Sequence, residues 1–169
     1  MSKNFQIRMA RLRVESVPGM LDAIREIGES LGLRIICMNA AKMAGYRHAE
    51  SAVRYGLRAE EEGAMTARSL EMEILLYVSG QRQTGIGMTF GLIEGEMIAW
   101  VGIVPGSDDA WKKLSGIMTF IQEEEEVPEE RIPLLKELYG ITDEELGVAG
   151  RDRIDELVIE RTALLEILK

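Results

Sequence analysis

The sequence predicts an α/β protein of the α+β kind, in which a small mixed sheet of about four strands is flanked by helices and the C-terminal third is helical. Residues 5–13 alternate apolar and polar side chains, as in a strand with one face in water. Residues 17–32 carry apolar side chains at helical spacing and end at a glycine. No repeat or low-complexity linker follows, so we expect one domain over residues 1–169.

The remaining elements follow in order along the chain. Residues 33–39 are apolar almost throughout, which favours a central strand. Residues 46–62 carry an apolar stripe with arginines opposite it, which predicts an amphipathic helix. Strands are expected over 95–104 and 117–121, and further helices are expected to start near Ser107, Glu129, Thr142 and Arg151.

Composition narrows the class of protein. With 46% hydrophobic and 29% charged residues, the chain is typical of soluble globular proteins. No run reaches the ~18 apolar residues of a membrane-spanning helix, and the first five residues lack the apolar segment of a signal peptide. Cys37 is the only cysteine, which excludes a disulfide within one chain. We therefore expect a cytoplasmic protein with no membrane contact.

The net charge of −9 is unevenly distributed along the chain. Residues 1–91 contain 12 Lys and Arg against 10 Asp and Glu, whereas residues 92–169 contain 8 against 19. A polyanionic partner should therefore contact the first half of the sequence. The acidic half suits a basic protein surface, or serves solubility alone.

The most informative segment is residues 67–83. Its apolar residues surround a helix on most sides, so we expect this helix to be buried. Gly80 follows it at the position where a left-handed C-cap belongs, and Gln81, Arg82 and Gln83 come next. The pattern indicates a buried helix that ends in a polar tip. An ordinary core helix with a surface turn is the alternative.

Catalysis has little support in the sequence. His48 is the only histidine, and a lone histidine beside an apolar stripe is more often structural than catalytic. No nucleophile elbow, HExxH or CxxC motif occurs, and the glycines of residues 85–91 have the wrong spacing for a dinucleotide site. We expect no enzymatic activity, no metal and no cofactor.

Nucleic-acid binding has better candidates. Arg47, Arg54 and Arg58 align on one face of the helix over 46–62, although such arginines are often only solvated. Amide side chains at the tip can contact base or sugar edges, and arginine and lysine can contact phosphates. The full set of candidates is Arg82, Gln83, Gln81, Arg47, Arg54, Arg58, His48 and Lys42.

The last helix carries a second signal, because it is apolar on two faces. Its broad face includes Leu164 and Leu168 and is expected to pack on the core. Ile159, Ala163 and Ile167 form a narrower stripe at i, i+4 and i+8. This stripe either lies under the chain's own loops or binds a partner protein.

The motifs of the central segment and of the last helix resemble those of the kinase-binding, tRNA-binding subunit of the KEOPS complex, the family of the PRPK-binding protein. MEILLYVSGQRQ, residues 72–83, resembles the family's core helix and turn. Asn39-Ala40 followed by His48 and Ala52 resembles a second family motif, and ELVIERTALLEILK resembles the terminal amphipathic helix. The likeness is specific over about residues 35–84.

The resemblance implies a non-catalytic role in threonylcarbamoyladenosine modification of tRNA. It implies binding to the small atypical kinase/ATPase subunit of the complex and to the 3′ CCA end of tRNA. We hypothesise that Arg82 and Gln83 contact the CCA end, that Arg47, Arg54 and Arg58 steer the acceptor stem, and that His48 stacks or hydrogen-bonds nearby. The narrow stripe of the last helix is assigned to the kinase.

Two other classes of function remain open. The glycine-rich stretch Gly85–Gly91 could border a pocket of a small-ligand enzyme or sensor, in which case a discrete ligand would raise the melting temperature. A scaffold with no RNA contact would show no affinity for the CCA end.

Overall fold

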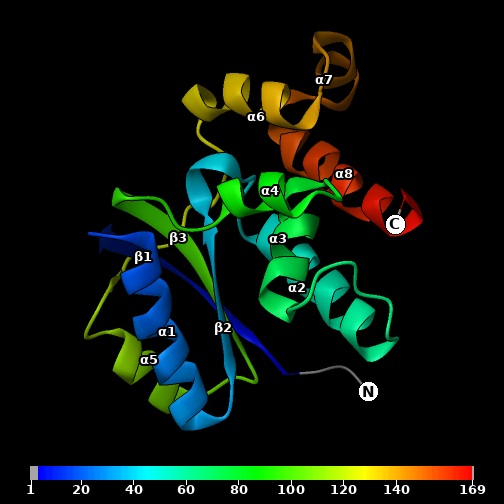
Figure 1. The fold of residues 1–169 in the computed structure, drawn as a ribbon. Helices are drawn as coiled ribbons and strands as arrows, with labels where there is room; N and C mark the ends of the chain where they lie inside the picture. Colours follow the sequence, from blue (N-terminus) through cyan, green and yellow to red (C-terminus); the bar gives the residue numbers. More distant parts are fainter. Residues whose placement is uncertain (1–3, 169) are drawn as a thin grey trace.

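The computed structural model describes residues 4–168 and confirms the α+β class with a helical C-terminal region (Figure 1). One sheet separates two helical layers. The strands are β1 (Gln6–Val14), β2 (Arg34–Asn39), β3 (Gly95–Val104) and β4 (Thr119–Phe120). The α-helices are α1 (Val17–Leu31), α2 (Tyr46–Glu61), α3 (Leu70–Ser79), α4 (Thr84–Gly87), α5 (Asp108–Leu114), α6 (Ile132–Tyr139), α7 (Asp143–Ala149) and α8 (Ile154–Leu168). Short 3₁₀ turns are η1 (Ala40–Lys42), η2 (Met88–Phe90), η3 (Glu129–Arg131) and η4 (Arg151–Arg153).

The sheet corrects two expectations about strand pairing. Its order is β2-β3-β1-β4 and all three pairings are antiparallel, so it is not mixed. β2 lies at an edge and not in the centre. Its side chains are nevertheless buried, because helices cover both of its faces. A strand covered on both faces reads as apolar throughout wherever it lies in the strand order.

The two layers enclose two hydrophobic cores. α1 and α5 pack on one face of the sheet, where Ile24, Trp111 and Leu114 are buried. α2, α3, α6 and α8 cover the other face with the larger core. α3 contacts α2 and α8 of this layer as well as α4, so its position depends on segments distant in the sequence.

α3 has the predicted form of a buried helix with defined ends. Ser69 caps its start by accepting from the Met72 amide at 3.1 Å. Residues 73–79 are all buried. Gly80 ends the helix at φ 68°, a left-handed conformation that favours glycine. Glu73 is buried and accepts from the amides of Thr66 and Ala67 at 2.9 and 2.7 Å, which fixes the loop before the helix.

Candidate nucleic-acid and partner interface

The last four carbonyls of a helix lack partners within the helix, and three of those in α3 accept hydrogen bonds from elsewhere or from its cap. The Leu76 carbonyl accepts from the amides of Gly80 and Gln81 at 2.8 and 3.3 Å. The Tyr77 carbonyl accepts from Thr162 Oγ1 of α8 at 2.8 Å. The Val78 carbonyl accepts from His48 of α2 at 3.0 Å and from the Tyr139 hydroxyl of α6 at 3.2 Å. Three other helices therefore fix the end of α3.

His48 is a structural residue in this network. It is fully buried, and its Nδ1 accepts the Ala44 amide at 3.1 Å, so the ring proton lies on Nε2 and is donated to the Val78 carbonyl. Burial lowers the pKa of His48 from 6.5 to about 4, which keeps the ring neutral. The expectation that His48 stacks against RNA is therefore wrong for this conformation, because no atom of the ring is accessible.

The predicted polar tip lies directly after this fixed helix end. Gln81, Arg82 and Gln83 are exposed. Arg82 donates from Nη1 to the carbonyl oxygen of Leu168, near the end of α8, at 2.9 Å. The Arg82 guanidinium is therefore oriented by a neutral acceptor, and among residues 4–168 no carboxylate forms an ion pair with it. Within the described part of the chain its other donors have no partner, and a guanidinium can offer such donors to an anionic ligand.

The chain after the tip turns into α4 and η2 and meets Lys42. The Lys42 ammonium donates to the Thr89 carbonyl at 2.9 Å and lies 5.2 Å from the centre of the Phe90 ring. α4 packs against α3, so the glycines at 85 and 87 form a compact excursion and do not extend the helix. This excursion connects Lys42 to the segment that begins with the tip.

The arginines of α2 have a different environment. Arg47 contacts Asp155 at 3.1 Å, and Arg54 contacts Glu50 at 3.5 Å and the ring of Phe5. Arg58 lies over the ring of Tyr55. The depression beside Arg47 is also lined by acidic side chains, namely Glu124, Glu125, Glu126, Asp152 and Asp155. The basic and acidic halves of the sequence therefore meet in space at α2.

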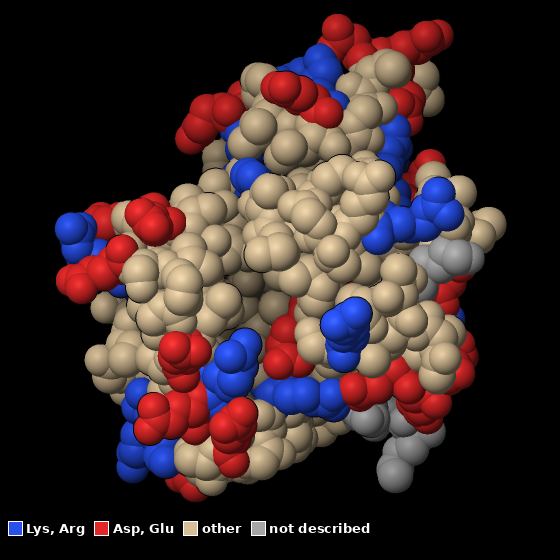
Figure 2. Space-filling view, viewed as in Figure 1, with Lys and Arg blue, Asp and Glu red and all other residues tan. Residues whose placement is uncertain are grey.

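Figure 2 shows the same mixing on the face that it displays, where blue and red side chains alternate around a broad neutral area over α3 and α4. Folding brings acidic residues of the second half beside Arg47, so its charge is compensated locally. That the α2 arginines steer an acceptor stem stays a prediction. Among residues 4–168, Arg47 has a carboxylate partner in Asp155, whereas the hydrogen bond of Arg82 goes to a carbonyl oxygen.

The two apolar faces of α8 are divided differently from the prediction. Ile159 and Ala163 are partly buried, and Ile167 is 78% exposed. Leu164 and Leu168, which were expected to pack on the core, are 45% and 57% exposed. Leu165 is fully buried between them, so α8 stays covered on the face of Val158, Thr162 and Leu165, and its other apolar residues near the C-terminal end are exposed. We call Leu164, Ile167 and Leu168 the α8 end patch.

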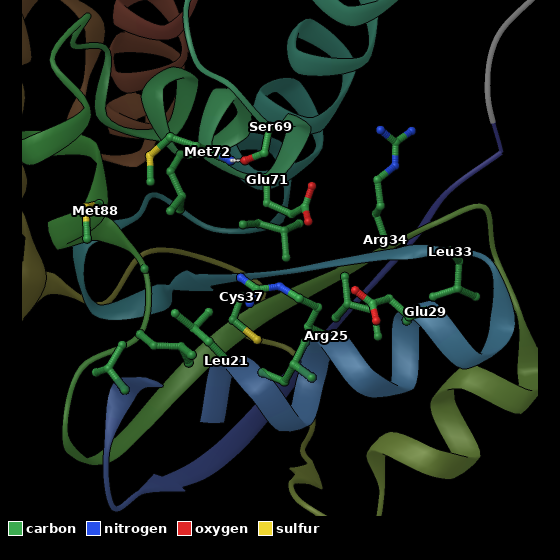
Figure 3. Close-up of a pocket in the computed structure, with 18 residues that line it drawn as sticks. Leu21, Arg25, Glu29, Leu33, Arg34, Cys37, Ser69, Glu71, Met72 and Met88 are labelled. Atoms are coloured by element: carbon green, nitrogen blue, oxygen red, sulfur yellow. Dashed lines mark hydrogen bonds between the residues drawn. The ribbon is translucent and has the colours of Figure 1, made fainter. Parts of the chain in front are cut away.

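A cavity of about 430 Å³ lies next to the end of the glycine-rich stretch, between this stretch and α1, β2 and α3 (Figure 3). Met88, Gly91 and Leu92 line it together with residues of α1, β2 and α3. The site considered for a small ligand near Gly85–Gly91 thus has a real cavity next to it. Among residues 4–168 there is no cluster of three or more side chains suited to a metal ion.

The sequence did not predict two of the residues that bind the last carbonyls of α3, Thr162 and Tyr139. Thr162 is the one polar residue among Val158, Leu165 and Ile154 on the buried face of α8, and this position was a usable signal for a buried hydrogen bond. Tyr139 precedes Gly140 at the end of α6 and gives no such signal, because its two acceptors, the carbonyls of Lys42 and Val78, are remote in sequence.

The family comparison gives a class of protein that is described by binding. Residues 21–166 match the family described as kinase binding protein CGI-121. The chain therefore belongs to this family of kinase-binding proteins, which confirms the resemblance found in the sequence. Among curated proteins, no sequence matches the chain. Within residues 4–168 there is no helix of the length and apolarity that crossing a membrane requires.

Proposed function

We propose that this protein is a non-catalytic, kinase-binding subunit of the KEOPS complex that supports threonylcarbamoyladenosine modification of tRNA and binds the 3′ CCA end of tRNA. The proposal places it in the cytoplasm, with the small kinase/ATPase subunit as its protein partner. Membership of the CGI-121 family supports the kinase-binding part. The polar tip at residues 81–83 supports the RNA part.

One observation carries the RNA proposal: an exposed Gln-Arg-Gln tip follows a helix end that side chains of α2, α6 and α8 hold in place. An unpaired RNA end is recognised through stacking and through hydrogen bonds to base edges and phosphates. A rigid mount reduces the entropy lost when such contacts form. The exposed tip and Lys42 are the residues that we assign to this contact.

Arg82→Ala should weaken tRNA binding about tenfold, because a charge-assisted hydrogen bond is worth roughly 1.5–3 kcal/mol. Filter binding or fluorescence anisotropy at fixed salt measures this change. Arg13→Ala is the matched control, since Arg13 is an exposed arginine of β1 whose ionic partner is Glu96 of β3. Arg47→Ala should have less effect than Arg82→Ala, because Asp155 already compensates Arg47. Equal losses for Arg82 and Arg13 would refute the assignment.

The α8 end patch, with the stripe of Ile159 and Ala163 beside it, is the surface that we assign to the kinase. It combines exposed apolar side chains with the acidic residues Glu156 and Glu160 of the same helix. Protein interfaces are often built from such an apolar centre with a charged rim. Because Arg82 contacts Leu168, the proposed RNA tip and kinase surface are direct neighbours.

Ile167→Glu should abolish co-elution with the kinase subunit in size-exclusion chromatography. A buried, unpaired carboxylate at an interface costs several kcal/mol. The variant should retain the circular dichroism of the parent protein, since Ile167 is exposed and its loss leaves no cavity. Leu134→Glu on α6 is the control for adding a carboxylate at an exposed apolar position. Normal co-elution of Ile167→Glu would contradict the assignment of the α8 end patch to the kinase.

A further inference from the structure

The free edge of β2 presents unpaired backbone groups. The Ile121 amide donates to the Met9 carbonyl at 3.0 Å, so the backbone of Met9 in β1 faces away from β3. Trp100, opposite Met9, must then direct its backbone toward Met38 of β2. By the alternation of a strand, the amides and carbonyls of Ile35 and Cys37 face away from β3.

Two neighbours confirm this orientation. Leu33, two residues before Ile35, donates its amide to the Gly28 carbonyl of α1 at 2.9 Å, on the side away from β3. A Cβ placed on Gly91 would lie 3.8 Å from the Cys37 carbonyl oxygen, so the chain at Gly91 borders the open edge at its Cys37 end. Among residues 4–168, the structure shows no hydrogen bond to the outward backbone groups of Ile35 or Cys37. An unpaired strand edge is a template for another strand.

The edge lies at the bottom of the 430 Å³ cavity, between two helical walls (Figure 3). Leu21 and Ile24 of α1 form one wall, and Met72 and Leu75 of α3 form the other. The side chains of an added strand would point alternately toward these two walls. Each wall offers apolar side chains, so the cavity suits alternate apolar side chains on both sides of such a strand.

The depth of the edge decides what kind of partner can reach it. A second folded copy of this chain would carry its own α1 and α3 beside its β2, and these helices would collide with the walls of the cavity. Only a single extended segment is thin enough to enter. The charged residues Arg25, Glu29, Arg34 and Glu71 line the same cavity with two charges of each sign, so no strongly charged segment is favoured.

We propose that this groove binds an extended, alternately apolar segment of another protein, which adds to β2 as a further strand of the sheet. The five residues Leu33–Cys37 line the groove, which corresponds to a segment of about five residues at roughly 3.3 Å each. This site lies on a different surface from Arg82 and the α8 end patch, and it is independent of the proposed RNA and kinase contacts.

A displayed library of random peptides of about seven residues, selected on the intact protein, tests the proposal. Selected peptides should carry apolar residues at alternate positions. Their binding should slow hydrogen exchange at the amides of Ile35 and Cys37, measured by NMR. N-methylation of the peptide amides that face β2 should weaken binding about tenfold or more, whereas methylation of the other edge should not.

Matched variants locate the binding. Leu21→Glu and Met72→Glu, one on each wall, should weaken binding at least about tenfold, because a carboxylate would be buried against apolar side chains. Leu134→Glu is the control, since Leu134 is 38% exposed on α6 and Leu21 is 42% exposed on α1. Failure to select any peptide that the wall variants lose, or equal effects of methylating either edge, would overturn the proposal. Binding of small molecules alone would do the same.

Discussion

His48→Ala should lower the free energy of unfolding by about 3 kcal/mol, since it leaves a cavity in a packed core and a buried amide without its acceptor. The Ala44 amide loses Nδ1, and the Val78 carbonyl keeps only the Tyr139 hydroxyl. The melting temperature should fall by roughly 10 °C for a protein of this size. Chemical denaturation followed by circular dichroism measures both quantities.

Two controls separate the network from general damage to α2. His48→Gln keeps a neutral side chain with an amide donor for the Val78 carbonyl, so it should recover part of the lost stability. Glu61→Ala, at an exposed position of the same helix, should change the free energy of unfolding by no more than about 0.5 kcal/mol. A stability loss in His48→Ala no larger than that of Glu61→Ala would mean that His48 does not fix the end of α3.

His48 should make the wild-type protein less stable as the pH falls from about 6.5 to about 4. The folded state keeps this imidazole neutral to about pH 4, whereas the unfolded chain binds a proton below 6.5. The unfolded state therefore binds more protons in this window, and stability falls as the pH falls. The shift corresponds to about 3 kcal/mol at full extent.

His48→Gln isolates this contribution, because glutamine does not titrate. Its free energy of unfolding should vary less with pH between 6.5 and 4 than that of the wild type, while carboxylates such as Glu145 act equally in both proteins. The pKa of Glu145 is lowered by the Thr142 amide and by Arg161, so its effect lies at the acid end of the range. Identical pH profiles for the two proteins would show that His48 is protonated in the folded state.

The parts of the fold that depend on local sequence were predictable. The buried helix, its serine cap and its glycine end follow from residues 69–80 alone. The capping box of Thr142 and Glu145 likewise follows from residues 142–145 alone. The polar tip could be predicted for the same reason, because it is the segment that follows a helix stop.

The parts that depend on tertiary placement were not predictable. The apolar run of β2 is the same at an edge as in the centre of a sheet, since helices cover both of its faces. The burial of His48 depends on Val78 and Tyr139. Val78 is 30 residues from His48 in the sequence, and Tyr139 is 61 residues from Val78. Leu164 and Leu168 are exposed although Leu165 is fully buried, and the apolar pattern of α8 does not show which of these leucines meets the core.

The central claim is that the tip at residues 81–83 binds an unpaired RNA end. The most direct measurement compares the affinity of the wild-type protein and of Arg82→Ala for intact tRNA and for the same tRNA lacking its CCA end. We predict that removal of CCA weakens wild-type binding about tenfold or more, and that it has little further effect on Arg82→Ala. Equal wild-type affinity for the two tRNAs would contradict the claim.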